Sequence, residues 1–200
     1  MARPRSDERR QAILSAAARV IAASGLGAPT AAIAKEAGVS NGSLFLYFDT
    51  KTTLINELYL ALKTEMASAA IAGLPSSGRE PREQMLRAWT QWTRWAASYP
   101  EKRRALAQLD VSGEVTAETH QAASEAFGGI TALVERSRAG GPMQDAPLGL
   151  VLSLTNAIAE ATTDAMIREP AEAEAHSIAG FGATWRVLAW CPALPPPDLP

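Results

Sequence analysis

The sequence has little of the chemistry on which most enzymes depend. Its 200 residues include one cysteine, Cys191, and two histidines, His120 and His176. A single cysteine excludes an intrachain disulfide framework and suits a reducing compartment, so we expect a cytoplasmic protein. Histidine is the side chain that most readily exchanges protons near neutral pH and binds transition metals. The chain therefore has the residues for few kinds of catalytic or metal site.

Several site patterns are also missing. The Glu-x-x-His pairs of helical di-iron proteins would need glutamate where Ala117 and Ala173 stand. The segment Gly25-Leu26-Gly27 lacks the third glycine and the preceding strand of a dinucleotide-binding fingerprint, and there is no Gly-x-x-x-x-Gly-Lys phosphate loop. We therefore predict no catalytic residue, no metal and no cofactor, and we expect that the protein is not an enzyme.

Long apolar runs are absent as well. No stretch of eighteen apolar residues occurs, and the N-terminus is polar and basic, so we expect neither a membrane partner nor a signal peptide. Charge is unevenly distributed: residues 1–51 hold seven basic and four acidic side chains, a balance of +3, whereas the whole chain carries −2. A basic first segment is typical of a protein that touches phosphate groups with one end.

What the sequence does contain is helical periodicity. Hydrophobic residues make up 47% of the chain, and no alternating apolar and polar run is bounded by hairpin turns. The predicted fold class is all-α. Beyond residue 60, breaks at glycine and proline predict helices at about 82–98, 101–110, 116–138, 147–168 and 172–190, followed by a proline-rich tail over 191–200.

The stretch 30–54 has the spacing of a helix-turn-helix. Thr30 is expected to cap a first short helix, and Gly38 to end it, because glycine takes up the left-handed conformation at little cost. Ser40 is expected to cap a second helix that runs to Phe48. A helix with an apolar stripe precedes the pair, and three helices in about fifty residues form a compact DNA-binding head. Spacing alone also fits three ordinary core helices.

One set of residues in this stretch is dense and specific: Ile33-Ala34, Ala37-Gly38-Val39-Ser40, Gly42-Ser43-Leu44-Phe45-Leu46-Tyr47-Phe48 and Lys51. With them, residues 8–60 resemble the N-terminal domain of the tetracycline-repressor (TetR) family of bacterial transcription regulators. The resemblance implies a helix-turn-helix DNA-binding domain over 1–55 and a larger helical domain for ligand binding and dimerisation over 56–190.

The resemblance also implies which residues would hold a double-stranded DNA operator. Ser40, Ser43, Tyr47 and Lys51 would mainly contact phosphates, Asn41 would read an adenine edge, and Phe45 would contact a thymine methyl group. The full predicted set is Arg3, Arg5, Thr30, Ser40, Asn41, Gly42, Ser43, Phe45, Leu46, Tyr47 and Lys51.

The second helix departs from the best-known members of the family in two ways. Leu46 stands where a polar or aromatic residue is common, and no arginine or lysine lies between Ser40 and Thr50. Positive charge is therefore expected from Lys51, from Lys35 and from a basic arm at Arg3-Pro4-Arg5, which would enter an adjacent minor groove.

The helix predicted at 82–98 carries three tryptophans on one face. They either pack in the core or line a cavity for an apolar or cationic ligand. The resemblance favours the cavity, because the family's C-terminal domains typically enclose a pocket for an effector molecule. The predicted pocket residues are Met85, Trp89, Trp92, Trp95, Tyr99 and His120.

Apolar stripes on the last two predicted helices fit either the core of one subunit or a symmetric interface. The resemblance favours a homodimer interface made by Leu150, Leu154, Ala157, Ile158, Ala161, Phe181, Trp185 and Leu188. The function expected overall is that of a homodimeric repressor released from its operator by a small effector molecule. The alternative is a helical small-molecule-binding or interaction protein that has lost DNA binding.

Overall fold

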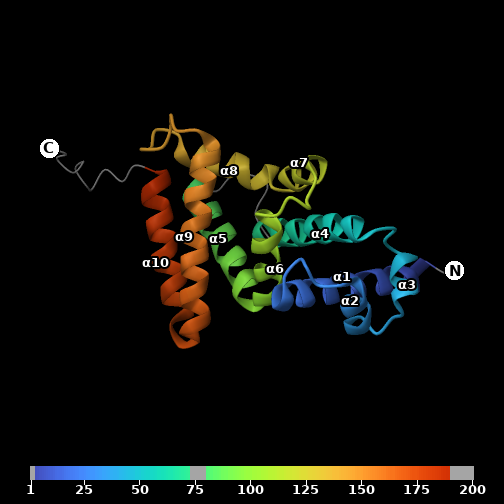
Figure 1. Ribbon diagram of the computed structural model, residues 1–200. Coiled ribbons are helices and arrows are strands. Elements are labelled where there is room, and N and C mark those ends of the chain that lie inside the picture. The colour runs from blue at the N-terminus through green and yellow to red at the C-terminus, as the bar shows by residue number, and fades with distance from the viewer. Residues whose placement is uncertain (1–2, 73–79, 190–200) are drawn as a thin grey trace. The chain divides into compact units, whose positions relative to one another are not determined.

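The computed structural model describes residues 3–72 and 80–189, with side chains from residue 6 onward (Figure 1). This part of the chain forms helices and no strand, which confirms the all-α prediction. The elements are α1 (Arg3–Ser24), α2 (Thr30–Glu36), α3 (Asn41–Phe45), α4 (Lys51–Ile71), α5 (Pro81–Ser98), α6 (Pro100–Asp110), α7 (Ala117–Ala126), α8 (Gly128–Arg138), α9 (Leu148–Arg168), a 3-10 turn (Pro170–Glu172) and α10 (Ala173–Leu188).

One predicted helix is divided in the structure. The segment expected as a single helix over 116–138 forms α7 and α8, which meet at Phe127. There the amide of Phe127 donates to the carbonyl of Ser124 at 3.0 Å, a tightened last turn. Two glycines, Gly128 and Gly129, follow at once, and glycine lowers the cost of breaking a helix. The predicted tail over 191–200 lies outside the described residues.

The chain divides into two compact units that do not follow the order of the sequence. The first combines the described parts of Met1–Met66 and Ser98–Phe127, and the second those of Ala67–Ala97 and Gly128–Pro200. Helix α4 therefore contributes to both units. None of the helices in residues 3–72 and 80–189 is long and apolar enough to cross a membrane.

The first unit contains the helix-turn-helix segment. Within it, α1 packs against α2 and α6, and α2 packs against α3. The apolar periodicity of each helix explains this packing, because residues three and four apart share one face. The fully buried residues of this core include Ile13, Ile33, Leu44, Phe48, Leu54 and Leu58. Leu44 and Phe48 face inward as predicted, and they anchor the segment that carries the proposed DNA contacts.

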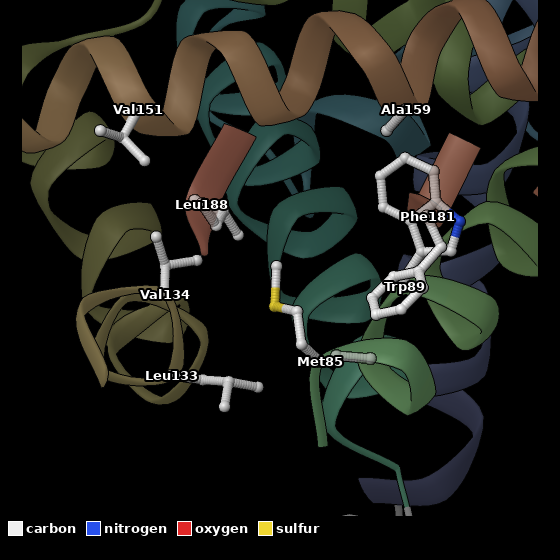
Figure 2. Packing of buried hydrophobic residues seen from close by; sticks show 9 residues of the cluster. Met85, Trp89, Leu133, Val134, Val151, Ala159, Phe181 and Leu188 are labelled. Carbon is white, nitrogen blue, oxygen red and sulfur yellow. The ribbon is translucent and has the colours of Figure 1, made fainter. Parts of the chain in front are cut away.

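The second unit is built around a hydrophobic cluster between α5, α8, α9 and α10 (Figure 2). Trp89 is its largest member and is 1% exposed. The indole N–H of Trp89 donates to the carbonyl of Ser177 at 2.9 Å, so its polar atom is satisfied inside the core. The cluster consists of Met85, Ala88, Trp89, Leu133, Val134, Val151, Ala159, Phe181 and Leu188.

Helices α9 and α10 lie side by side in the second unit (Figure 1). Gly180 permits their close approach, since a Cβ atom at this position would run into the side chain of Thr162 and the ring of Trp89. The hydroxyl of Thr162 cannot readily move away, because it donates to the carbonyl of Ile158 at 2.8 Å. The packing of this helix pair therefore depends on a residue without a side chain at position 180.

Candidate nucleic-acid interface

The turn between α2 and α3 is formed as the sequence predicts. Gly38 has φ of +68°, the left-handed conformation that favours glycine. The amide of Val39 then reaches back to the carbonyl of Ala34 at 2.9 Å and closes the end of α2. The next residue, Ser40, caps α3, with its hydroxyl accepting a hydrogen bond from the amide of Ser43 at 3.0 Å.

The structure corrects two predicted boundaries in this motif. Pro29, rather than Thr30, occupies the N-cap position of α2, and Thr30 is the first helical residue. Proline has its φ fixed near the −70° found here, and α2 begins without a side-chain cap. Helix α3 ends at Phe45 instead of Phe48, because the amides of Leu46 and Tyr47 bond to carbonyls three residues back.

A surface hollow of about 290 Å³ lies along the turn and α3. It is lined by Arg9, Gly38, Val39, Ser40, Ser43, Leu46 and Tyr47. Four of these residues carry groups that can donate hydrogen bonds to phosphate oxygens, one of them a charged guanidinium. The hollow thus brings together three sequence-predicted phosphate contacts, Ser40, Ser43 and Tyr47, with one residue that the sequence reasoning missed, Arg9.

Arg9 was missed because it lies outside the helix-turn-helix, on α1. The signal that points to it is helical geometry: Arg9 and Arg10 are adjacent, so they leave α1 in directions about 100° apart. Arg10 is directed inward, where its guanidinium pairs with Glu57 and lies 5.1 Å from the centre of the Phe48 ring. Arg9 is exposed and lines the hollow.

The basic residues of the first unit differ in how much of their charge is available to DNA. Arg19 donates to Glu36 at 2.7 Å and ties α1 to α2. The ammonium group of Lys51 donates to the carbonyl of Leu26 at 2.6 Å and is half-buried, so it holds the loop between α1 and α2. Within the described residues, Arg9 and Lys35 are exposed and form no ion pair.

The other predicted DNA contacts vary in exposure. Asn41 and Gly42 are exposed at the start of α3, Phe45 is 38% exposed, and Leu46 is 84% exposed. Arg3 and Arg5 belong to the first turn of α1, so the backbone of the predicted basic arm is helical. The side chains of these two arginines lie outside the described residues.

The predicted pocket residues are distributed over both units. In the second unit, Met85, Trp89 and Trp95 are buried, and Trp92 packs against Trp89 with the ring centres 6.0 Å apart. For Met85 and Trp89 this is the arrangement of core residues. Tyr99 belongs to the first unit, where its ring lies 4.4 Å from the ammonium of Lys102.

His120 takes part in a polar cluster of the first unit. The hydroxyl of Tyr59 donates to Asp110 at 2.8 Å and lies 3.1 Å from Nδ1 of His120, while Lys63 pairs with the same aspartate at 2.9 Å. Burial of the tyrosine, together with its hydrogen bond to Asp110, raises the pKa of Tyr59. The cluster joins α4 to α6 and α7.

The residues predicted at a subunit interface fall into two groups. On α9, Leu150, Leu154, Ala157 and Ala161 are exposed along one face, and Ile158 is half-buried. On α10, Phe181 and Leu188 are buried in the core of their own unit, and Trp185 is half-buried with its ring stacked on Phe181. The exposed large apolar residue of α10 is Ile178, at 61%.

Comparison with known proteins agrees with this geometry. Residues 13–58 match the family model described as bacterial regulatory proteins, tetR family. A protein from Shewanella sp. PV-4, described as a tetR-family transcription regulator, shares 28% identity, with 92% of this chain and 99% of that chain covered and a TM-score of 0.79.

Two further solved structures have the same fold. A TetR family transcription regulator from Marinobacter aquaeolei VT8 shares 22% identity over 94% of this chain and 98% of that chain, with a TM-score of 0.79. The regulator FadR from Bacillus subtilis, solved in complex with stearoyl-CoA, shares 17% identity over 90% and 97%, with a TM-score of 0.64.

The matched residues 13–58 contain the whole of the turn, the capped α3 and the inward-facing anchors. The structural likeness extends over both compact units. Regulators of this family are generally not enzymes. Residues 13–58 thus match the tetR-family regulatory proteins, and the chain as a whole has the fold of TetR-family transcription regulators.

Proposed function

We propose that the protein is a homodimeric repressor that holds a near-palindromic operator and releases it when a small molecule binds. The observation that carries the DNA-binding part is the hollow beside α3, in which an exposed guanidinium and three hydroxyl-bearing side chains face the solvent together. Such donors suit the evenly spaced phosphates of a duplex. Two heads would enter successive major grooves about one helical turn apart.

Some residues of the DNA-binding head contact phosphates and others contact bases. Arg9, Ser40, Ser43 and Tyr47 hold phosphates, since they line one hollow. Thr30 adds a phosphate contact at the start of α2, and Lys51 does so with the donors not used by Leu26. Exposed Asn41 reads an adenine edge, and Phe45 contacts a thymine methyl group.

The dimer is proposed to form through the outer face of α9 and α10. Leu150 and Leu154 are 49% and 38% exposed, and Ile178 on the neighbouring helix is 61% exposed. Exposed apolar side chains on adjacent helices favour burial against a second copy, and the small residues Ala157 and Ala161 permit close helix approach. Phe181 and Leu188 would support this face from the core.

The dimer is tested with Leu154→Lys, measured by sedimentation velocity. The variant should remain folded, because the side chain is exposed, and should sediment as a monomer. The control is Val111→Lys, which places the same charge at a residue that is 87% exposed in the first unit and should leave the dimer intact. An intact dimer of the Leu154 variant under dilute conditions would contradict the proposed interface.

The effector is proposed to be a small apolar or cationic molecule bound among the helices of the second unit. The ligand would have to prefer the state that cannot bind DNA, because a ligand with equal affinity for both states shifts nothing. The half-buried Trp92 is the tryptophan of α5 most able to report such a ligand. A fluorescence screen should include alkyl ammonium compounds and, since FadR of Bacillus subtilis binds it, stearoyl-CoA.

The central experiment is a binding assay with DNA that flanks the protein's own gene. The expected result is a specific complex whose affinity falls steeply with salt and which a compound from the screen dissolves. No preference for any flanking fragment over unrelated DNA would refute operator binding at this locus. Release by compounds that leave both fluorescence and thermal stability unchanged would refute the proposed effector site.

The base contact of Asn41 is tested separately. Asn41→Ala should relax the preference at one base pair in each half-site, because a bidentate contact to adenine contributes about 1–3 kcal/mol of discrimination. Competition binding against a panel of single-base operator variants measures this. A uniform loss of affinity across the panel would instead assign Asn41 to the phosphate backbone.

A further inference from the structure

Leu46 is an exposed leucine at a place where it contributes little to folding. Its side chain is 84% exposed, whereas Leu44, two residues earlier, is completely buried. Leu46 forms the C-cap of α3, where the backbone alone makes the closing hydrogen bonds. Neither the core nor the helix end therefore requires a large apolar side chain at this position.

The surroundings of Leu46 are polar and suited to nucleic acid. It lines the same hollow as Arg9, Ser40 and Tyr47, so an exposed apolar side chain stands among donors for phosphate oxygens. A protein partner would have to leave the guanidinium without a matching acceptor or supply an acidic group for it. A DNA duplex offers both kinds of partner at once, with phosphates on its rim and base edges on its floor.

We propose that Leu46 determines base specificity by contacting the C5-methyl group of a thymine in each operator half-site. This inference rests on the proposed function. A leucine side chain has no donor or acceptor, and the thymine methyl is the apolar group on the base edges of the major groove. Phe45 shares this chemistry, but its ring is 38% exposed and so presents a smaller free surface than Leu46.

The inference explains how a recognition helix without arginine or lysine can still select a sequence. Between Ser40 and Thr50 no side chain can make the bidentate contact to guanine that arginine makes. Base readout by this helix then falls to the amide of Asn41 for adenine and to the apolar surfaces of Phe45 and Leu46 for thymine, of which Leu46 is the more exposed. The operator half-site is expected to contain a thymine whose replacement lowers the binding affinity.

The test removes the methyl group and nothing else. An operator is first selected from a random duplex library with the wild-type dimer, and each thymine is then replaced in turn by deoxyuridine, which keeps the same hydrogen-bonding edge. Losing contact with one methyl group should weaken wild-type binding about fourfold, and about fifteenfold when both half-sites are changed. Fluorescence anisotropy with labelled duplexes measures the affinities.

The result that tests the role of Leu46 is the response of Leu46→Ala to the loss of the thymine methyl group. This variant should bind the thymine operator more weakly and should no longer distinguish thymine from deoxyuridine at one position of the half-site. Leu46→Met, which keeps an apolar side chain of similar volume, should retain the distinction. The matched control is Val111→Ala, which truncates an apolar residue that is 87% exposed outside the hollow and should leave the deoxyuridine profile unchanged.

The outcomes separate the inference from the proposed function. If the wild-type protein selects no operator, the proposed function fails and the inference fails with it. If an operator is selected and Leu46→Ala shows the same deoxyuridine profile as the wild type, the role of Leu46 is overturned while operator binding stands. A profile lost in Phe45→Ala but kept in Leu46→Ala would also overturn it, by assigning the methyl contact to the neighbouring ring.

Discussion

Arg9 offers the sharpest test of how this protein holds DNA. It is the exposed arginine that lines the hollow beside α3, and it forms no ion pair within the described residues. Replacing it by glutamine removes one positive charge and keeps a polar side chain of similar length. Because the side chain is exposed, we expect the thermal stability of the variant to stay close to that of the wild type.

The expected magnitude follows from counterion release. Each phosphate neutralised on duplex DNA contributes about 0.9 to the slope of log affinity against log salt, so a dimer that loses two such contacts should lose about 1.8 from its slope. The ratio of wild-type to variant affinity should then be about twelvefold larger at 50 mM than at 200 mM salt. Fluorescence anisotropy titrations at four or five salt concentrations resolve this difference.

The matched control is Arg19→Gln, which makes the same change of charge at the same residue type on the same helix. The guanidinium of Arg19 is already paired with Glu36, so its removal should cost at most about 1 kcal/mol of stability and change the slope much less. Equal changes in slope for the two variants would mean that net charge, and not a contact in the hollow, governs affinity. An unchanged slope in Arg9→Gln would refute the phosphate contact itself.

Three further predictions concern stability and are measured by chemical denaturation. Gly180→Ala should destabilise the protein by about 1–3 kcal/mol, because the new methyl group would collide with the hydrogen-bonded Thr162 between α9 and α10; equal stability would show that this helix pair can shift apart at little cost. Tyr59→Phe should cost about 1 kcal/mol at neutral pH through its lost hydrogen bond. Since the pKa of Tyr59 is raised in the folded state, wild-type stability should fall as the pH rises above 10, the usual tyrosine value, and the variant should lack that part of the fall. Lys51→Ala should lower stability by about 1 kcal/mol as well as operator affinity, because its ammonium group holds the carbonyl of Leu26; weakened binding at unchanged stability would leave it a phosphate contact only.

Several local patterns were predicted correctly, although the start of α2 and the end of α3 were not. Gly38 ends α2 and Ser40 begins α3, because left-handed geometry and side-chain capping depend on neighbours in the chain. The burial of Leu44 and Phe48 followed from their four-residue spacing. Thr50 caps α4 in the same local way, accepting from the amide of Thr53 at 3.0 Å.

Contacts between segments far apart in the chain could not be predicted from the sequence. The Arg9 side chain meets the hollow of α3 across about thirty residues of chain, and no periodicity within one helix reports such a meeting. For the same reason Lys51, which the sequence offers as a free cation, is tied to Leu26, and the tryptophan face of α5 contains Trp89, whose indole is bonded to Ser177. The sequence likewise did not show whether the apolar stripes of α9 and α10 lie in the core of one subunit or face outward.

The sequence by itself determined that the chain is helical and where its helix-turn-helix lies, because both depend on short-range propensity, capping and spacing. The tertiary structure decided which charged side chains form ion pairs within the molecule and which remain unpaired. It pairs Arg10 and Arg19 with glutamates, while Arg9 lines the hollow with Leu46. The physical reason is that a side chain's availability depends on what packs against it, and those neighbours come from segments far apart in the chain.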